Sequence, residues 1–193
     1  MNKNVATTLC VVIAVTFALS SCASETEVPG DFVDISLAES KSPTQLLRNS
    51  TAERITPEVV DKIVTSDDLS VACLGADTDP KATVRAWQSS VQISLTGDGG
   101  DRLDELVTTL VASYEEQGWS ASALGGTGRG GSKLLFSETA PQSIQVVGLQ
   151  PNEVRPDAFS GDAISSASIL IVVSGPCVRT DGVDSDEVKQ LEI

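Results

Sequence analysis

Hydrophobic and polar side chains alternate most clearly between Trp87 and Leu95. Val91, Ile93 and Leu95 fall at every second position, and the positions between them are polar. Successive side chains of a β-strand point to opposite faces, so this pattern predicts a strand with one buried and one solvent-facing side. Trp87 belongs to the buried side, where a large aromatic residue favours core packing over a ligand groove.

Hydrophobic residues follow a helical period a little further along the chain. The stripe consists of Leu103, Leu106, Val107, Leu110, Val111 and Tyr114. That spacing places them on one face of an amphipathic helix. Asp101 is expected to cap its start, and Gly118 suits the left-handed residue that follows a helix end.

Two further helices are predicted nearer the N-terminus. Ser42–Pro43 and Thr56–Pro57 each place a capping residue before a proline at the first helical position. The second of these helices is expected to end at Asp67–Asp68, and its apolar face would consist of Val59, Val60, Ile63 and Val64.

The remaining apolar runs are short and predict strands. They cover residues 71–74, 120–124, 133–137, 144–149 and 164–173. The last run is the most apolar and indicates a central strand that is covered on both faces, or a strand covered by the helix and the N-terminal section. The order of elements predicts an α+β fold (α/β in the broad sense), a two-layer sandwich of a mostly antiparallel sheet with one main amphipathic helix plus N-terminal helices.

The N-terminus follows a different pattern. Lys3 precedes an apolar run from Leu9 to Leu19, which two serines separate from Cys22. The run is about half of the roughly 20 residues that a membrane-spanning helix needs, so it favours an export signal over a transmembrane anchor.

The residues around Cys22 resemble a bacterial lipobox. That resemblance implies that Cys22 becomes the first mature residue and carries a diacylglyceryl group. The protein would then be a lipoprotein on the extracytoplasmic face of the cell membrane, anchored by its lipid. The alternative is an ordinary secretory signal in which Cys22 is incidental.

These segments divide the chain into four parts. We expect a signal peptide at 1–21, a flexible tether at 22–41, a single globular domain at 42–180 and an acidic C-terminal tail at 181–193. The tether is rich in Ser, Glu, Asp and Ala, a composition that does not favour a packed core.

The charge of the chain excludes some partners. It has 13 basic and 27 acidic residues and a formal net charge of -14. Nucleic acids and anionic lipid surfaces repel such a protein, so the lipid on Cys22 would provide the membrane attachment. Solubility is the simplest meaning of the acidity.

The four cysteines have separate expected fates. Cys10 lies in the signal peptide and Cys22 is the lipidation site, which leaves Cys73 and Cys177. In an exported protein these two are expected to form a disulfide. Two free thiols or metal ligands are the alternatives, but the chain has no histidine and no CxxC, which disfavours a metal site. We expect no cofactor.

Several of these features together resemble small lipoproteins of actinobacteria, some of which are grouped as LppA-like. The shared pattern consists of Cys73, Trp87, the amphipathic helix, Gly118–Trp119 and Cys177. The resemblance implies an envelope lipoprotein with a compact α/β domain and implies no catalytic residue.

A glycine-rich segment is the clearest candidate for a ligand or partner loop. Gly126, Gly128, Arg129 and Gly130 belong to a stretch that fits G-x-G-x-x-G. A dinucleotide site would need a helix after this stretch, whereas residues 133–137 predict a strand. A hairpin loop is favoured, in which glycines would let the backbone approach a partner closely.

Function is open between three hypotheses. The first is a non-catalytic, tethered envelope domain that binds a protein partner or a small envelope ligand. The second is a lipid or glycolipid carrier with an apolar cavity between helix and sheet, for which the run 164–173 is the only hint. An enzyme of unrecognised type is third, because no histidine is present to activate a serine.

Overall fold

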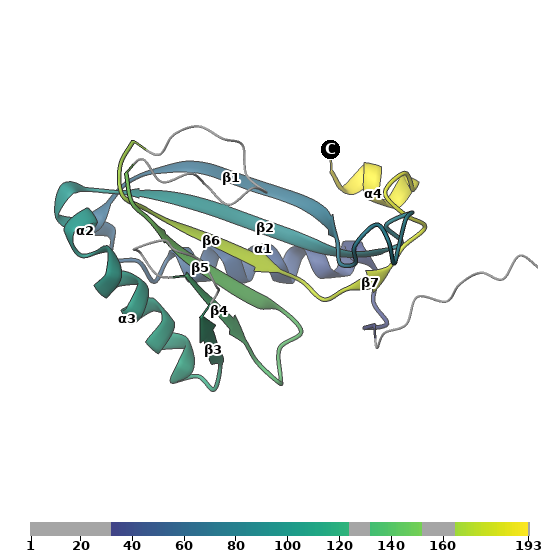
Figure 1. Ribbon diagram of the computed structural model, residues 1–193, viewed down its shortest axis with the longest axis horizontal. Helices are drawn as coiled ribbons and strands as arrows, with labels where there is room; N and C mark the ends of the chain where they lie inside the picture. Colours follow the sequence, from purple (N-terminus) through teal and green to yellow (C-terminus); the bar gives the residue numbers. More distant parts are fainter. Residues whose placement is uncertain (1–31, 124–131, 152–164, 193) are drawn as a thin grey trace, which may run out of the picture.

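The protein forms one antiparallel sheet with helices against it (Figure 1). The computed structural model describes residues 32–123, 132–151 and 165–192. The strand order is β1-β2-β6-β5-β4-β3, and β7 pairs with the far end of β2. The α+β fold predicted from the sequence is therefore confirmed. The strands are β1 (Val60–Ala72), β2 (Val84–Leu95), β3 (Ser120–Ala123), β4 (Ser132–Phe136), β5 (Ser143–Leu149), β6 (Ser168–Ser174) and β7 (Val178–Arg179).

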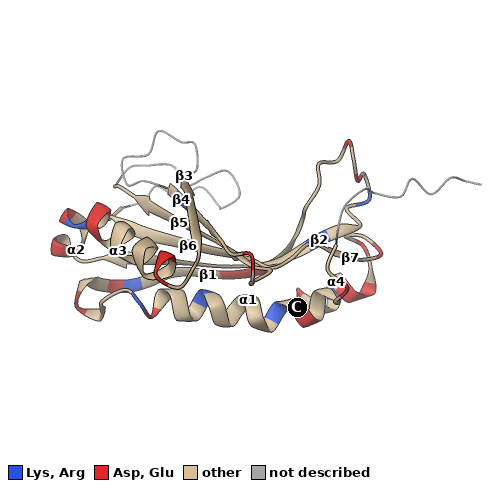
Figure 2. Ribbon diagram, turned by 90° about the horizontal axis from the view of Figure 1, so that it is seen from below, with Lys and Arg blue, Asp and Glu red and all other residues tan. Residues whose placement is uncertain are grey.

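Helices α1 and α3 supply the second layer, and Figure 2 shows α1 running along one face of the sheet. The helices are α1 (Leu37–Ala52), α2 (Gly97–Asp101), α3 (Leu103–Glu115) and α4 (Asp186–Leu191), with a 3-10 turn η1 (Pro57–Val59). Apolar side chains of α3 pack against β2, β5 and β6 in the main core. No helix in the described ranges is long and apolar enough to cross a membrane.

Strand β6 occupies the interior of the sheet, as its apolar sequence predicted. Ile169, Ile171 and Val173 join the core under the helices. Leu170 and Val172 point to the opposite face, where they form a second buried cluster with two residues of β5. Both faces of β6 are therefore buried.

The alternating strand β2 corrects one expectation. All of its residues except Gln88 are buried, so its polar side does not face water. On that side, the polar side chains of β2 bond to serines of β6 and of the segment just before it. The Gln92 side-chain amide donates to Ser168 Oγ at 2.9 Å, and the Ser94 and Ser166 hydroxyls lie 2.7 Å apart.

The prediction of a helix after Thr56–Pro57 is wrong. Only the turn η1 forms there, and β1 then runs from Val60 to Ala72 against β2. Bulges between Val60 and Lys62 and between Ile63 and Thr65 shift the register. Each extra residue interrupts the alternation, so apolar positions spaced as on a helix belong to a strand of β-branched residues.

Helix α1 begins earlier than Ser42–Pro43. Ser36 caps it in a capping box, in which Glu39 N–H donates to Ser36 Oγ at 3.2 Å and Ser36 N–H donates to Glu39 Oε2 at 2.8 Å. Pro43 lies inside the helix on its exposed side, where water can reach the carbonyl that proline leaves unbonded. Residues 37–41 therefore belong to α1 rather than to a flexible tether.

The expected cap of α3 is also corrected. Thr96 caps the short helix α2, through a 3.3 Å bond from Gly99 N–H, and α2 leads directly into α3. Asp101 is the last residue of α2 and caps nothing. Gly118 has a φ of +86°, which confirms the left-handed conformation expected there.

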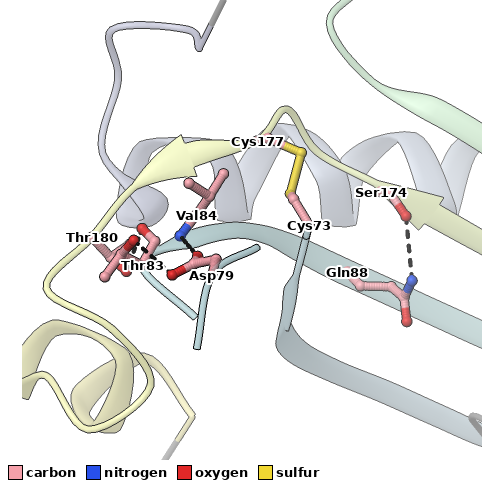
Figure 3. The surroundings of a disulfide bond; sticks show 8 residues. All are labelled: Cys73, Asp79, Thr83, Val84, Gln88, Ser174, Cys177 and Thr180. Carbon is pink, nitrogen blue, oxygen red and sulfur yellow. Dashed lines mark hydrogen bonds between the residues drawn. A yellow bond between two sulfur atoms is a disulfide. The ribbon is translucent and has the colours of Figure 1, made fainter. Parts of the chain in front are cut away.

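One end of the domain is closed by a disulfide and by α4. Cys73 and Cys177, which are 104 residues apart in sequence, form the predicted disulfide. Figure 3 shows that it joins the chain after β1 to the connection between β6 and β7. In the chain-entropy account, a loop of this length corresponds to about 4–5 kcal/mol of stabilisation. Val188 of α4 is buried against Leu37 and Trp87, so part of the acidic tail packs on the domain.

Candidate interaction site at the edge of the sheet

Strand β1 is the longest of the exposed strands in the described sheet. It lies at the end of the strand order and pairs only with β2. Helix α1 packs mainly against β2 and β6, and it reaches β1 through the side chain of Arg48. Of the residues of β1 only Ser70 is buried, and the side chains of Ile63 and Leu69 are 65% and 38% exposed.

The register shows which backbone groups of β1 point away from the sheet. Gly175 N–H donates to Trp87 O at 2.8 Å, so Trp87 bonds toward β6. Alternate residues of an antiparallel strand bond to opposite neighbours. Ser70 is paired with Trp87 and therefore directs its backbone groups to the open side. The same alternation directs those of Asp68 and Ser66 to the open side.

The chain itself occupies the open side at Ser70. Ser70 N–H donates to Glu192 Oε1 at 3.0 Å, and the Ser70 hydroxyl donates to the same oxygen at 2.7 Å. The buried guanidinium of Arg85 donates from Nη2 to Ser70 O at 2.8 Å. Both edge-facing backbone groups of Ser70 are thus bonded, and the open part of the edge lies before it.

A polar cluster under β1 holds the open part in place. The Arg48 guanidinium of α1 bonds to Ser66 Oγ and donates to Ser90 O at 3.2 Å. It also lies 3.8 Å from Asp68 Oδ2, and Trp87 Nε1 donates to Asp68 Oδ1 at 3.4 Å. These contacts fix the Ser66 and Asp68 side chains on the helix side and leave their backbones facing outward.

The exposed charged side chains of β1 are mainly acidic, and they stand among exposed apolar ones. Asp61 and Asp67 are exposed, and Lys62 is the single cation of the strand. Asp67 is paired with Ser90, on the face away from α1. Asp67 and Asp68 therefore point to opposite faces and do not form the paired carboxylates that a hydrolase would need.

The best-formed cavity of the described residues is small. It has a volume of about 80 Å³ and lies between Ile55, after α1, and Leu110 of α3. Sites for small molecules are typically about 300–1,000 Å³. The described part of the chain therefore gives the lipid-carrier hypothesis no support.

The most buried carboxylate has a structural role. Asp79 is 4% exposed, and its oxygens accept bonds from Val84 N–H at 2.7 Å and from the Thr83 hydroxyl at 3.0 Å (Figure 3). A bond from the Thr83 backbone is the main cause that lowers the pKa of Asp79, and burial opposes it. Asp79 therefore holds the turn before β2. Within the described ranges, no three His, Cys, Asp or Glu residues are grouped as a metal site.

The sequence-predicted site residues are only partly placed. Cys73 and Cys177 are joined as expected. Trp87 is fully buried, which confirms its predicted core role. The partly buried Trp119 packs edge-on against Tyr114 at a centroid distance of 5.4 Å. Cys22 and the loop with Gly126, Gly128, Arg129 and Gly130 lie outside the described residues.

The sequence pattern does not predict the open edge of β1, because apolar residues at helical spacing favour a helix there. The abundance of β-branched residues from Val59 to Thr65 was the signal that favoured a strand.

No protein-family model, curated protein or solved structure matches the chain. The resemblance to LppA-like lipoproteins stays a prediction.

Proposed function

We propose that this protein is a lipid-anchored, non-catalytic domain of the bacterial cell envelope that binds a partner protein. The observation that supports the proposal most is β1, a 13-residue strand that is exposed along most of its length and open on one side. An unpaired strand edge is a template for association with another chain. The rest of the domain supplies a packed and disulfide-linked support for it.

The anchor is compatible with this role. Cys22 precedes the first residue of α1 by 15 positions. Even a fully extended segment of that length spans only about 50 Å. The lipid would therefore keep β1 close to the membrane surface, and an acidic surface would limit its direct contact with anionic lipid head groups.

Site-specific photo-crosslinking in cells tests the proposal. A photoreactive amino acid at Leu69, on the exposed part of β1, is expected to yield a discrete crosslinked species. The matched control is Phe136 of β4, a comparably exposed apolar residue (46% against 38%) that is expected to yield none. The captured protein is then purified and its binding to the full lipoprotein is measured. The proposal fails if neither position yields a species, or if the purified protein does not bind.

A further inference from the structure

We infer that β1 binds by strand addition, taking an extended segment of a partner protein with basic side chains along its open edge from Asp61 to Asp68. This inference rests on the proposed function and specifies both the binding mode and the class of partner.

The backbone supplies the first argument. Ser66 and Asp68 direct N–H and C=O groups to the open side, and no described residue bonds to those groups. An added strand would pair with all four groups, which is the basis of peptide recognition by β-augmentation. At Ser70 the same groups are already taken by Glu192 and Arg85. The fold therefore limits the accessible edge to the part before Ser70.

The open edge of β1 is already ordered in the unbound protein. Arg48 reaches from α1 to the side chains of Ser66 and Asp68, and β2 bonds to the other side of the strand. Binding then costs conformational entropy mainly in the partner segment and little in β1. A flexible loop of the same composition would not have this advantage.

The charge of β1 favours one class of partner segment over another. Asp61 and Asp67 are the exposed acids of the open stretch and Lys62 is its exposed cation, while the carboxylate of Asp68 is paired with Arg48. Opposite charges on neighbouring strands attract and like charges repel. A second copy of this chain would bring the same exposed acids and a net charge of -14, and both disfavour self-pairing. A basic segment of another protein is favoured on both grounds.

The experiment uses the full-length lipoprotein in detergent and a defined probe. The probe is a nine-residue peptide that alternates lysine with valine, and the comparison peptide has glutamate in place of lysine. Only the lysine peptide is expected to bind. On binding, amide hydrogen exchange at Ser66 and Asp68 is expected to slow at least tenfold. Exchange at Asp67, whose amide bonds to β2, is expected to stay nearly unchanged.

Two variants with the same change in net charge provide the control. Asp67→Lys is expected to weaken binding of the lysine peptide at least fivefold. Glu138→Lys, at an exposed position after β4, is expected to change it less than twofold. Absence of binding, binding without alternating protection, or equal weakening by both variants would overturn the inference. The proposed function would still stand if a partner captured by crosslinking bound without protecting Ser66 and Asp68.

Discussion

At the scale of single residues, the buried side of α1 is unusual because it is mainly polar. Ser40, Thr44 and Thr51 are almost fully buried. The Thr44 hydroxyl donates to Ser40 O at 2.7 Å, and the Thr51 hydroxyl lies 2.6 Å from the Tyr114 hydroxyl. Small side chains that bond to their own helix or to one neighbour remain satisfied without water. They also let α1 approach the sheet closely.

That close approach predicts a specific requirement for glycine at position 175. A Cβ atom there would lie 2.9 Å from Thr44 Oγ1 and 3.5 Å from Ser40 Cβ. We expect Gly175→Ala to lower the free energy of unfolding by about 1–3 kcal/mol, because α1 has to shift. Urea denaturation measures the change. Gly75→Ala is the control, since a Cβ at Gly75 meets nothing within 4 Å, and similar losses in both variants would contradict the explanation.

Asp79 gives a pH-dependent prediction at the same scale. Its pKa is lowered, chiefly by the Thr83 backbone bond, so the folded-state pKa lies below the unfolded value of about 3.9. The stabilisation is therefore fully present above about pH 4 and is lost as the pH falls through the lower folded-state pKa. Asp79→Asn is expected to be less stable than wild type at pH 7.

The difference between Asp79→Asn and wild type should shrink on going from about pH 5 to about pH 3. The midpoints of urea denaturation at pH 7, about pH 5 and about pH 3 measure this difference. Asp181→Asn, in an exposed loop, is the control. A difference that stays constant over this range would show that the charge of Asp79 is not the cause.

At the scale of elements, the sequence predicts correctly the helices and strands whose hydrophobic pattern is regular. The stripe of α3 and the apolar run of β6 are both found where they were expected. In β1, the two bulges hide the strand period. In α1, Pro43 favoured a helix start at Ser42–Pro43. The helix begins earlier, at the capping box formed by Ser36 and Glu39. Local irregularity, rather than weak propensity, explains both errors.

The end of β1 is bonded to Glu192, the residue that follows α4, and a substitution there tests the contact. Glu192→Ala removes the carboxylate that accepts from Ser70 N–H. We expect a loss of about 0.5–1.5 kcal/mol in unfolding free energy and faster hydrogen exchange at the Ser70 amide. Gln190→Ala, at an exposed position of α4, is the control and should leave that amide unchanged. Unaltered exchange in Glu192→Ala would show that the carboxylate does not protect the edge.

At the scale of the whole molecule, the sheet order lies beyond what the sequence shows. Strand β6 is placed between β2 and β5, although more than 70 residues separate it from β2. Alternation predicts a strand but does not identify its neighbours, and many partners offer similar hydrophobic burial. The cysteine pair was the one long-range constraint available. It predicted that the chain after β1 meets the chain after β6, and the disulfide confirms this. The open edge, by contrast, follows from the complete strand order.

The proposed lipid anchor is the property of the whole molecule that would give the edge its location, and Cys22 is the residue that tests it. Cys22→Ser should move the protein from the membrane to the soluble fraction and abolish labelling by a palmitate analogue, because acyl chains supply the binding energy at about 0.8 kcal/mol per buried methylene. Cys10→Ser, which removes a cysteine of the expected signal peptide, should change neither result. Fractionation and labelling measure both. If Cys22→Ser stayed in the membrane, a different anchor would hold the domain, and the distance limit placed on β1 would no longer apply.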